Sequence, residues 1–128
     1  LMLAEEMTET YGYRTVQAMM QLDNPPTAYL TSSIIPAIGV RRAIEEAGLQ
    51  MGRDISVITH DDDLSYLRNG DDVPQFTATR SSVREAGRQL AEMLIQQINE
   101  PSGTPLTRLL EAELTVGRST GPAPERKT

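Results

Sequence analysis

The polar residues best suited to chemistry follow a short apolar segment. His60 and the three Asp residues 61–63 come directly after residues 55–59, which have the composition of a buried strand. Carboxylates at the end of a strand can accept hydrogen bonds from ligand hydroxyls or hold a hard cation. A solvated acidic turn explains the same residues equally well. A phosphoacceptor site is disfavoured because the only lysine, Lys127, lies in the tail.

Two further groups of polar side chains lie where a predicted strand meets a helix. Ser32 and Ser33 follow the segment 27–31, and Arg80 follows the segment 76–79. Hydroxyls and free backbone N–H groups at such a junction can bind an anion or a sugar hydroxyl, and an exposed Arg can bind a carboxylate. N-capping by a serine and a surface ion pair of Arg80 are the simpler interpretations.

The composition excludes several kinds of site. The 128 residues include no Cys, one His and one Lys, which excludes thiolate chemistry, a His-rich metal centre and a lysine Schiff base. The net charge of −6 argues against direct binding of nucleic acid. No nucleotide-binding fingerprint and no apolar run of membrane-spanning length is present, and His60 has no defined nucleophile beside it. We therefore expect no cofactor, no metal, no catalytic residue and no membrane contact.

The hydrophobic pattern predicts alternating helices and strands around these residues. We expect helices over 8–22, 36–47 and 82–99, and strands over 27–31, 55–59, 76–79 and 110–116. This order predicts an α/β fold, a parallel sheet covered by helices, in which ligands bind at the carboxyl ends of the strands. Ser32, Ser33 and the acidic run are at such ends.

The second half of the chain has clear local signals. Ser82 and Glu85 form a capping box for the helix 82–99, which has one continuous apolar face. In the segment 110–116, Leu and Val alternate with polar residues, which predicts a strand with one buried face. The segment 64–75 is predicted to be a loop, and the Pro-rich, charged segment 121–128 a disordered tail.

Five groups of short motifs in sequence order carry a family resemblance. They are Pro26-Thr27-Ala28; Ala37-Ile38-Gly39 with Ala47-Gly48-Leu49; the segment 54–62; the segment 74–80 with Glu85-Ala86-Gly87; and Leu114-Thr115-Val116 with Ser119-Thr120. Together they resemble the lac repressor (LacI/GalR) family of transcription regulators, whose effector domain is similar to periplasmic sugar-binding proteins. The resemblance covers most of the chain.

This resemblance implies a type I periplasmic-binding-protein-like fold, present as an incomplete carboxy-terminal portion. Residues 1–75 would form most of the carboxy-terminal subdomain, 76–106 a crossover and a helix of the other subdomain, and 107–120 the returning strand. The DNA-binding domain would lie outside this sequence. The helix 82–99 would then lack its sheet, and we expect it to pack against a second copy or to fold back.

The resemblance also implies a small polar effector, such as a sugar, in the cleft between the subdomains. Asp61 matches an effector-binding Asp of the family, whereas Ser33-Ile34 replaces an Asn-Asp pair and His60 replaces an aromatic residue. The predicted effector-binding residues are Asp61, Ser33, Ser32, His60 and Arg80.

A homodimer is expected through the helix 36–47, with core packing as the other use of the same face. The predicted dimer residues are Ile38, Arg41, Ile44 and Tyr66. Such a regulator would act in the cytoplasm. Two alternatives remain open: a solute-binding subunit of an uptake system, and a metal-dependent enzyme that uses the carboxylates 61–63.

Overall fold

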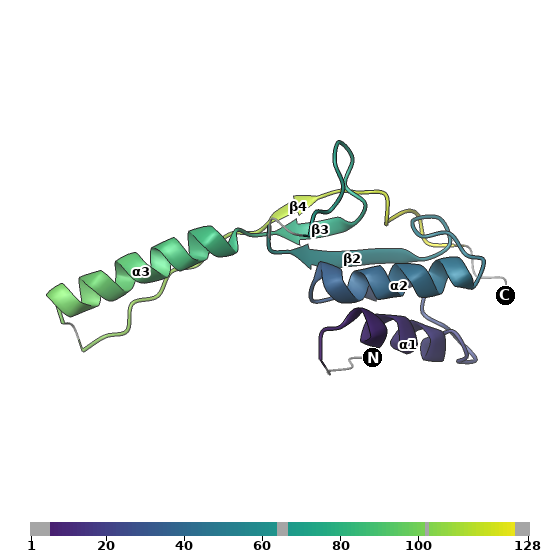
Figure 1. Ribbon diagram of the computed structural model, residues 1–128, viewed down its shortest axis with the longest axis horizontal. Coiled ribbons are helices and arrows are strands. Elements are labelled where there is room, and N and C mark those ends of the chain that lie inside the picture. Colours follow the sequence, from purple (N-terminus) through teal and green to yellow (C-terminus); the bar gives the residue numbers. More distant parts are fainter. Residues whose placement is uncertain (1–5, 64–66, 102, 125–128) are drawn as a thin grey trace.

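Helices and strands alternate along the chain in the computed structural model, which describes residues 6–63, 67–101 and 103–124 (Figure 1). The elements are α1 (Glu9–Met19), β1 (Ala28–Leu30), α2 (Ile34–Glu46), β2 (Ser56–Asp61), β3 (Thr77–Arg80), α3 (Val83–Asn99) and β4 (Glu113–Thr115). Each predicted helix and strand is present, with ends shifted by one to three residues in most cases. Helix ends shift because caps and tertiary contacts, rather than periodicity, decide the last turn.

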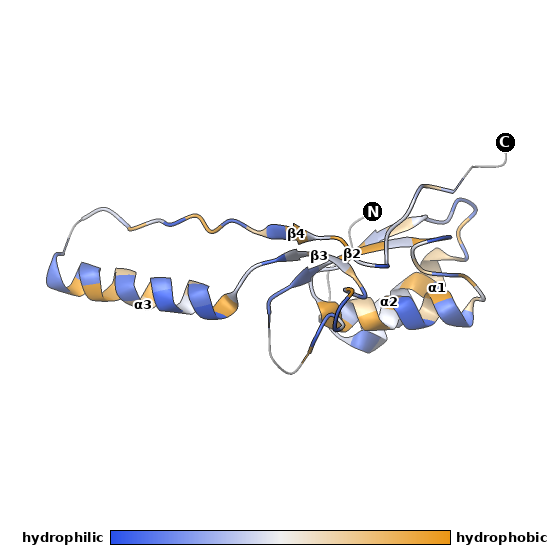
Figure 2. Ribbon diagram, turned by 90° about the horizontal axis from the view of Figure 1, so that it is seen from above, coloured by the Kyte–Doolittle hydropathy of each residue, from blue (hydrophilic) through white to orange (hydrophobic). Residues whose placement is uncertain are grey.

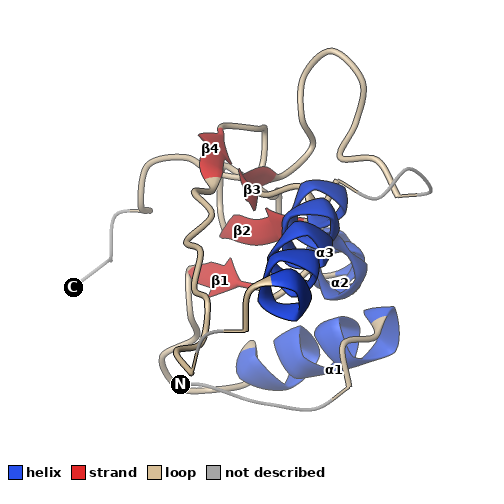
Figure 3. Ribbon diagram, turned by 90° about the vertical axis from the view of Figure 1, so that its left-hand side faces the viewer, coloured by secondary structure: helices blue, strands red, loops and turns tan. Residues whose placement is uncertain are grey.

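The strands form one sheet in the order β1-β2-β3-β4. β1, β2 and β3 are parallel, which confirms the predicted fold class, whereas β4 is antiparallel to β3 because the chain returns from α3 in the opposite direction. α1 and α2 both lie on the same side of this sheet (Figure 3). The expected covering of the sheet by helices is therefore limited to one face among the described elements.

The core lies between α1, α2 and the covered face of the sheet. Its buried side chains are mainly aliphatic, together with one aromatic ring: Val16, Ile34, Ala37, Val40, Ala43, Ile44, Ile55, Val57 and Phe76. Two glycines permit the close approach of the helices. A Cβ atom on Gly39 would lie 2.8 Å from the backbone nitrogen of Tyr13, and one on Gly12 would lie 3.0 Å from the Cα of Pro36. α1 and α2 thus touch backbone to backbone.

α3 projects away from this body (Figures 1 and 2). It contains no buried residue and contacts no other described helix or strand; the extended segment 103–112 runs back alongside it. Its apolar side chains remain exposed: Leu90, Leu94, Ile95 and Ile98. The expectation that this helix folds back is therefore wrong, whereas packing against a second copy stays a prediction.

Local signals are sufficient to form α3 even without packing. The Ser82 hydroxyl accepts a hydrogen bond from the Glu85 amide at 3.2 Å, which confirms half of the predicted capping box. The Glu85 carboxylate instead binds Arg88 and Gln89 of the next turn. Although it is the longest described helix, neither it nor any other described helix is long and apolar enough to cross a membrane.

The returning segment differs from its prediction. Only Glu113–Thr115 forms a strand, and the side chains expected to be buried are exposed at Leu110, Leu114 and Val116. Apolar and polar residues do alternate in this segment, but no described helix or strand covers its apolar side chains. The tail residues 121–124 form no helix or strand, and the rest of the tail lies outside the described residues. The sheet of the body extends to Arg80, beyond the boundary expected near residue 75.

Candidate functional site

The predicted effector-binding residues gather at the carboxyl ends of β1, β2 and β3. Asp61 and Arg80 are paired residues at the ends of neighbouring parallel strands, and Ser33 follows the end of β1 beside them. In Figure 1 the arrowheads of β2 and β3 point toward α3, so this edge of the sheet is also where the chain leaves the body.

Asp61 is the acidic residue placed deepest at this edge. It is 8% exposed, and its Oδ1 accepts a hydrogen bond from the Asp63 amide at 3.0 Å. Among the described residues, no donor forms a hydrogen bond with its Oδ2. A buried carboxylate binds donors strongly, because a hydrogen bond to a charged group contributes about 1.5–3 kcal/mol. Asp61 can therefore receive a hydrogen bond from a ligand hydroxyl.

Ser33 does not have the capping role that its position suggests. It is the N-cap residue of α2, but its side chain makes no capping hydrogen bond, and its buried Oγ has no hydrogen-bond partner among the described residues. Leaving a buried hydroxyl unpaired is unfavourable by about 1–3 kcal/mol, so a ligand that bonds to it gains affinity. Ser32 is exposed at the same junction.

Two threonines that sequence reasoning missed connect β1 to β2. The Thr31 hydroxyl lies 2.8 Å from the Thr59 hydroxyl and 3.1 Å from the Ser33 carbonyl oxygen. Thr59 is 1% exposed and lies on the same face of β2 as Asp61. The period of two along the strand was the available signal, because residues 57, 59 and 61 must share one face.

The other two predicted residues are bound to protein groups. Nδ1 of His60 lies 2.9 Å from the Thr79 hydroxyl, and Nε2 lies 3.0 Å from the Ser81 hydroxyl. Arg80 forms an ion pair with Asp63, and the hydrogen bond that the Arg80 guanidinium donates to this carboxylate raises the pKa of Arg80. Half of the Arg80 side chain remains exposed. A ligand at Asp61 would meet the free edge of Arg80, whereas His60 lies on the opposite face of β2 from Asp61.

The carboxylates 61–63 do not form a metal centre in the structure. Among the described residues, no three His, Cys, Asp or Glu side chains are arranged to hold a metal ion. Asp61 binds its own turn and Asp63 pairs with Arg80, so the two carboxylates serve different partners. The metal-enzyme alternative has no support in this geometry.

The predicted dimer residues have different environments. Arg41 is on the surface, where its Nε binds Glu45 at 2.7 Å, and Ile38 is partly buried. Ile44 has 0% exposure and packs inside the core, so it cannot contact a second copy, and the core-packing alternative is correct for it. Tyr66 lies outside the described residues.

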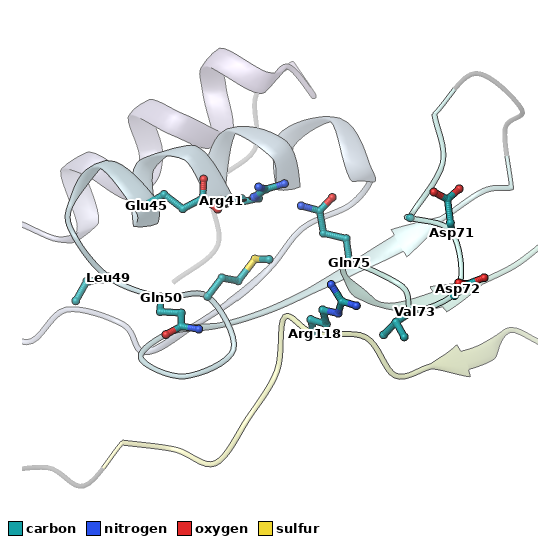
Figure 4. Close-up of a pocket in the computed structure, with 11 residues that line it drawn as sticks. Arg41, Glu45, Leu49, Gln50, Asp71, Asp72, Val73, Gln75 and Arg118 are labelled. Atoms are coloured by element: carbon teal, nitrogen blue, oxygen red, sulfur yellow. Dashed lines mark hydrogen bonds and ion pairs between the residues drawn. The ribbon is translucent and has the colours of Figure 1, made fainter.

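A pocket of about 670 Å³ lies beside Arg41 (Figure 4). Its residues come from α2, from the segments that precede β2 and β3, and from the segment that follows β4, so it is not at the edge occupied by Asp61 and Ser33. Charged groups of both signs line it: Arg41, Arg118, Glu45, Asp71 and Asp72. Leu49, Met51 and Val73 add apolar surface.

Comparison with known proteins agrees with this fold. The family model described as "Periplasmic binding protein-like domain" matches residues 2–120. The chain is 47% identical over 120 residues to the HTH-type transcriptional regulator AglR of Rhizobium meliloti (strain 1021). This match covers 94% of the chain and 34% of AglR. The chain is 32% identical over 119 residues to the lactose operon repressor of Escherichia coli (strain K12), with coverage of 91% and 31%.

A solved structure of the dimeric Lac repressor with an 11-residue C-terminal deletion matches with a TM-score of 0.75 and 28% identity. This match covers 92% of the chain and 42% of that structure. The predicted resemblance to LacI/GalR regulators is thereby confirmed. The chain spans about a third of the length of the curated relatives described above.

Proposed function

Because the chain belongs to the periplasmic binding protein-like domain family, we propose that it is the effector-sensing and dimerising part of a transcription regulator. Its relatives AglR and the lactose operon repressor are named as regulators. Binding to DNA is assigned to parts of such a regulator outside this sequence, and the site of action is the cytoplasm.

The observation that carries this proposal is the pairing of a buried carboxylate with an unpartnered buried hydroxyl at one edge of the sheet. Asp61 accepts hydrogen bonds, and Ser33 can donate or accept one. Such a combination suits a neutral polyhydroxyl compound, because each sugar hydroxyl both donates and accepts. Ser32 and Arg80 add exposed polar groups at the rim. The effector is therefore a small polar molecule of the sugar class.

The function is a shift between conformations rather than a reaction. His60 is the only His in the chain, and both of its ring nitrogens bind hydroxyls at the edge of the sheet. An effector that binds one domain arrangement better than another shifts the population toward it. In this proposal the body is the carboxy-terminal subdomain, and α3 with residues 103–112 belongs to the other subdomain.

Titration with neutral sugars tests the effector site. We expect glucose, ribose or maltose, added at millimolar concentration, to shift the NMR amide signals of residues 31–33 and 59–61 in a saturable way. Asp61→Asn should weaken this binding about tenfold, since a charged hydrogen-bond acceptor is lost. Asp54→Asn is the matched control, because Asp54 lies before β2 at the other end of the strand. The proposal fails if none of the three sugars saturates or if both variants bind equally.

The dimer is proposed to form on the exposed side of α2, around Ile38 and Arg41. The mixed charges of the neighbouring pocket support this, because a two-fold interface places each patch against its own copy and needs both signs within it. Sedimentation should show a dimer that Arg41→Glu weakens. Arg53→Glu, at a largely exposed residue outside the pocket, should leave it intact. A monomeric unmodified chain would contradict the proposal.

A further inference from the structure

The chain leaves the body for α3 through a short connection that the end of β2 holds. The Ser81 amide donates to the Asp61 carbonyl oxygen at 3.2 Å, and the Val83 amide donates to the Asp62 carbonyl oxygen at 3.5 Å. Since α3 contacts no other described helix or strand, its direction depends on this connection and on the returning segment. Figure 1 shows that β3 leads into the projecting arm, which consists of α3 and the segment 103–112, and that the arm returns to β4.

The side chain of His60 adds two hydrogen bonds to the same junction. His60 and Thr79 are paired residues of neighbouring strands, so their side chains lie on the same face of the sheet. The ring reaches Thr79 with Nδ1 at 2.9 Å and Ser81 with Nε2 at 3.0 Å. In a neutral imidazole one nitrogen donates and the other accepts, and a hydroxyl can take either role. The ring therefore fixes β3 and the first residue beyond it.

The connection between β3 and α3, residues 81–82, is called the hinge below. We propose that His60 is a positioning residue of this hinge. His60 holds Ser81 against the end of β2 and thereby sets the direction of α3. The residue next to it carries the ligand contact. The Asp61 carboxylate faces the candidate site, while the Asp61 carbonyl oxygen holds the Ser81 amide.

A consequence for regulation rests on the proposed function. Movement of Asp61 toward an effector shifts the carbonyl group that anchors the hinge, and the His60 bridge transmits this shift to the start of α3. The contact thus connects the binding site to the arm through a continuous set of hydrogen bonds.

Hydrogen exchange of the Ser81 amide in the free 128-residue chain tests the positioning role. His60→Phe keeps a ring of similar size but removes both hydrogen bonds, and we expect it to accelerate Ser81 exchange about tenfold. His60→Gln retains a donor and an acceptor and should restore most of the protection. Ser81→Ala removes one partner without changing β2, and exchange of its residue 81 amide should accelerate in the same direction.

The amides of Val57 and Phe76 serve as internal references, because each is bound within the body away from the hinge. We expect their exchange to be unchanged in all three variants. Equal Ser81 exchange in His60→Phe and the unmodified chain overturns the proposal, and so does uniform acceleration of all amides, which indicates general destabilisation. No ligand is present in this experiment, so its outcome is separate from that of the sugar titration.

Discussion

The hydroxyl groups of Thr31 and Thr59 lie 2.8 Å apart and join the residue that follows β1 to β2. This contact places Ser33 and Asp61, which belong to the same two strand ends, at one edge of the sheet. Backbone pairing continues to Thr31, whose amide donates to the Ile58 carbonyl oxygen at 2.9 Å, but it does not by itself orient the side chains. The hydroxyl pair therefore extends the order of the sheet into the candidate site.

Removal of this hydroxyl pair should destabilise the protein modestly. Thr59→Val keeps the shape of the buried side chain but deletes the hydrogen bond, and the expected loss in the free energy of unfolding is about 1 kcal/mol. Urea denaturation followed by circular dichroism measures it. Thr115→Val on β4 is the matched control, because no hydrogen bond of this side chain is found among the described residues. Equal losses in both variants would contradict the role of the pair.

The contact between α1 and α2 makes Gly39 intolerant of a side chain. A Cβ atom there would lie 2.8 Å from the Tyr13 nitrogen and closer still to the Glu9 carbonyl oxygen. Gly39→Ala should destabilise the body by about 3 kcal/mol, since two backbones must separate. Gly87→Ala on α3 meets nothing within 4 Å and should raise helicity instead. Thermal denaturation of both variants distinguishes a steric effect from helix propensity.

The stability of α3 should depend on pH through Glu85. Hydrogen bonds from Arg88 and then Gln89 lower the pKa of the Glu85 carboxyl from 4.5 to about 2. Because the folded pKa is the lower one, the contribution to the helix is complete above pH 4.5. It declines as the pH falls toward 2 and is absent below that value. A carboxyl ¹³C NMR titration measures this pKa directly.

Arg88→Met should return the pKa of Glu85 toward 4.5, because it deletes the largest cause of the shift. Arg84→Met on the same helix removes one positive charge from a residue with no ion pair among those described, and should leave the pKa near 2. If both substitutions raise the pKa equally, general electrostatics rather than the hydrogen bond from Arg88 lowers it.

Because the apolar face of α3 is exposed, a charge at Leu94 of α3 should affect stability far less than a charge at the buried Ile44 of α2. Leu94 is 62% exposed, so Leu94→Glu should change the free energy of unfolding of the body by less than about 0.5 kcal/mol. Ile44 is 0% exposed, and Ile44→Glu should prevent folding. Light scattering should also show that Leu94→Glu lowers association at high concentration. Loss of folding in Leu94→Glu would mean that α3 packs on the body.

Much of the fold was predictable because its signals are local. Ser82 caps the start of α3, Gly48 follows the end of α2 with a φ of 73°, and the run at 55–59 contributes to an interior strand of the sheet. The carboxyl ends of parallel strands must lie at one edge, so the grouping of Ser33, Asp61 and Arg80 followed from the order of the elements.

The sequence by itself determined the α/β class, the LacI/GalR resemblance and the edge of the sheet that bears the polar residues. It did so because periodicity, caps and short motifs depend on neighbours along the chain. Only the tertiary structure decided that the Ser33 hydroxyl lacks a partner in the part of the chain that the structure describes, that His60 binds Thr79 and Ser81, and that Ile44 belongs to the core. These facts depend on contacts between residues up to tens of positions apart, where packing and burial choose among the partners that composition allows.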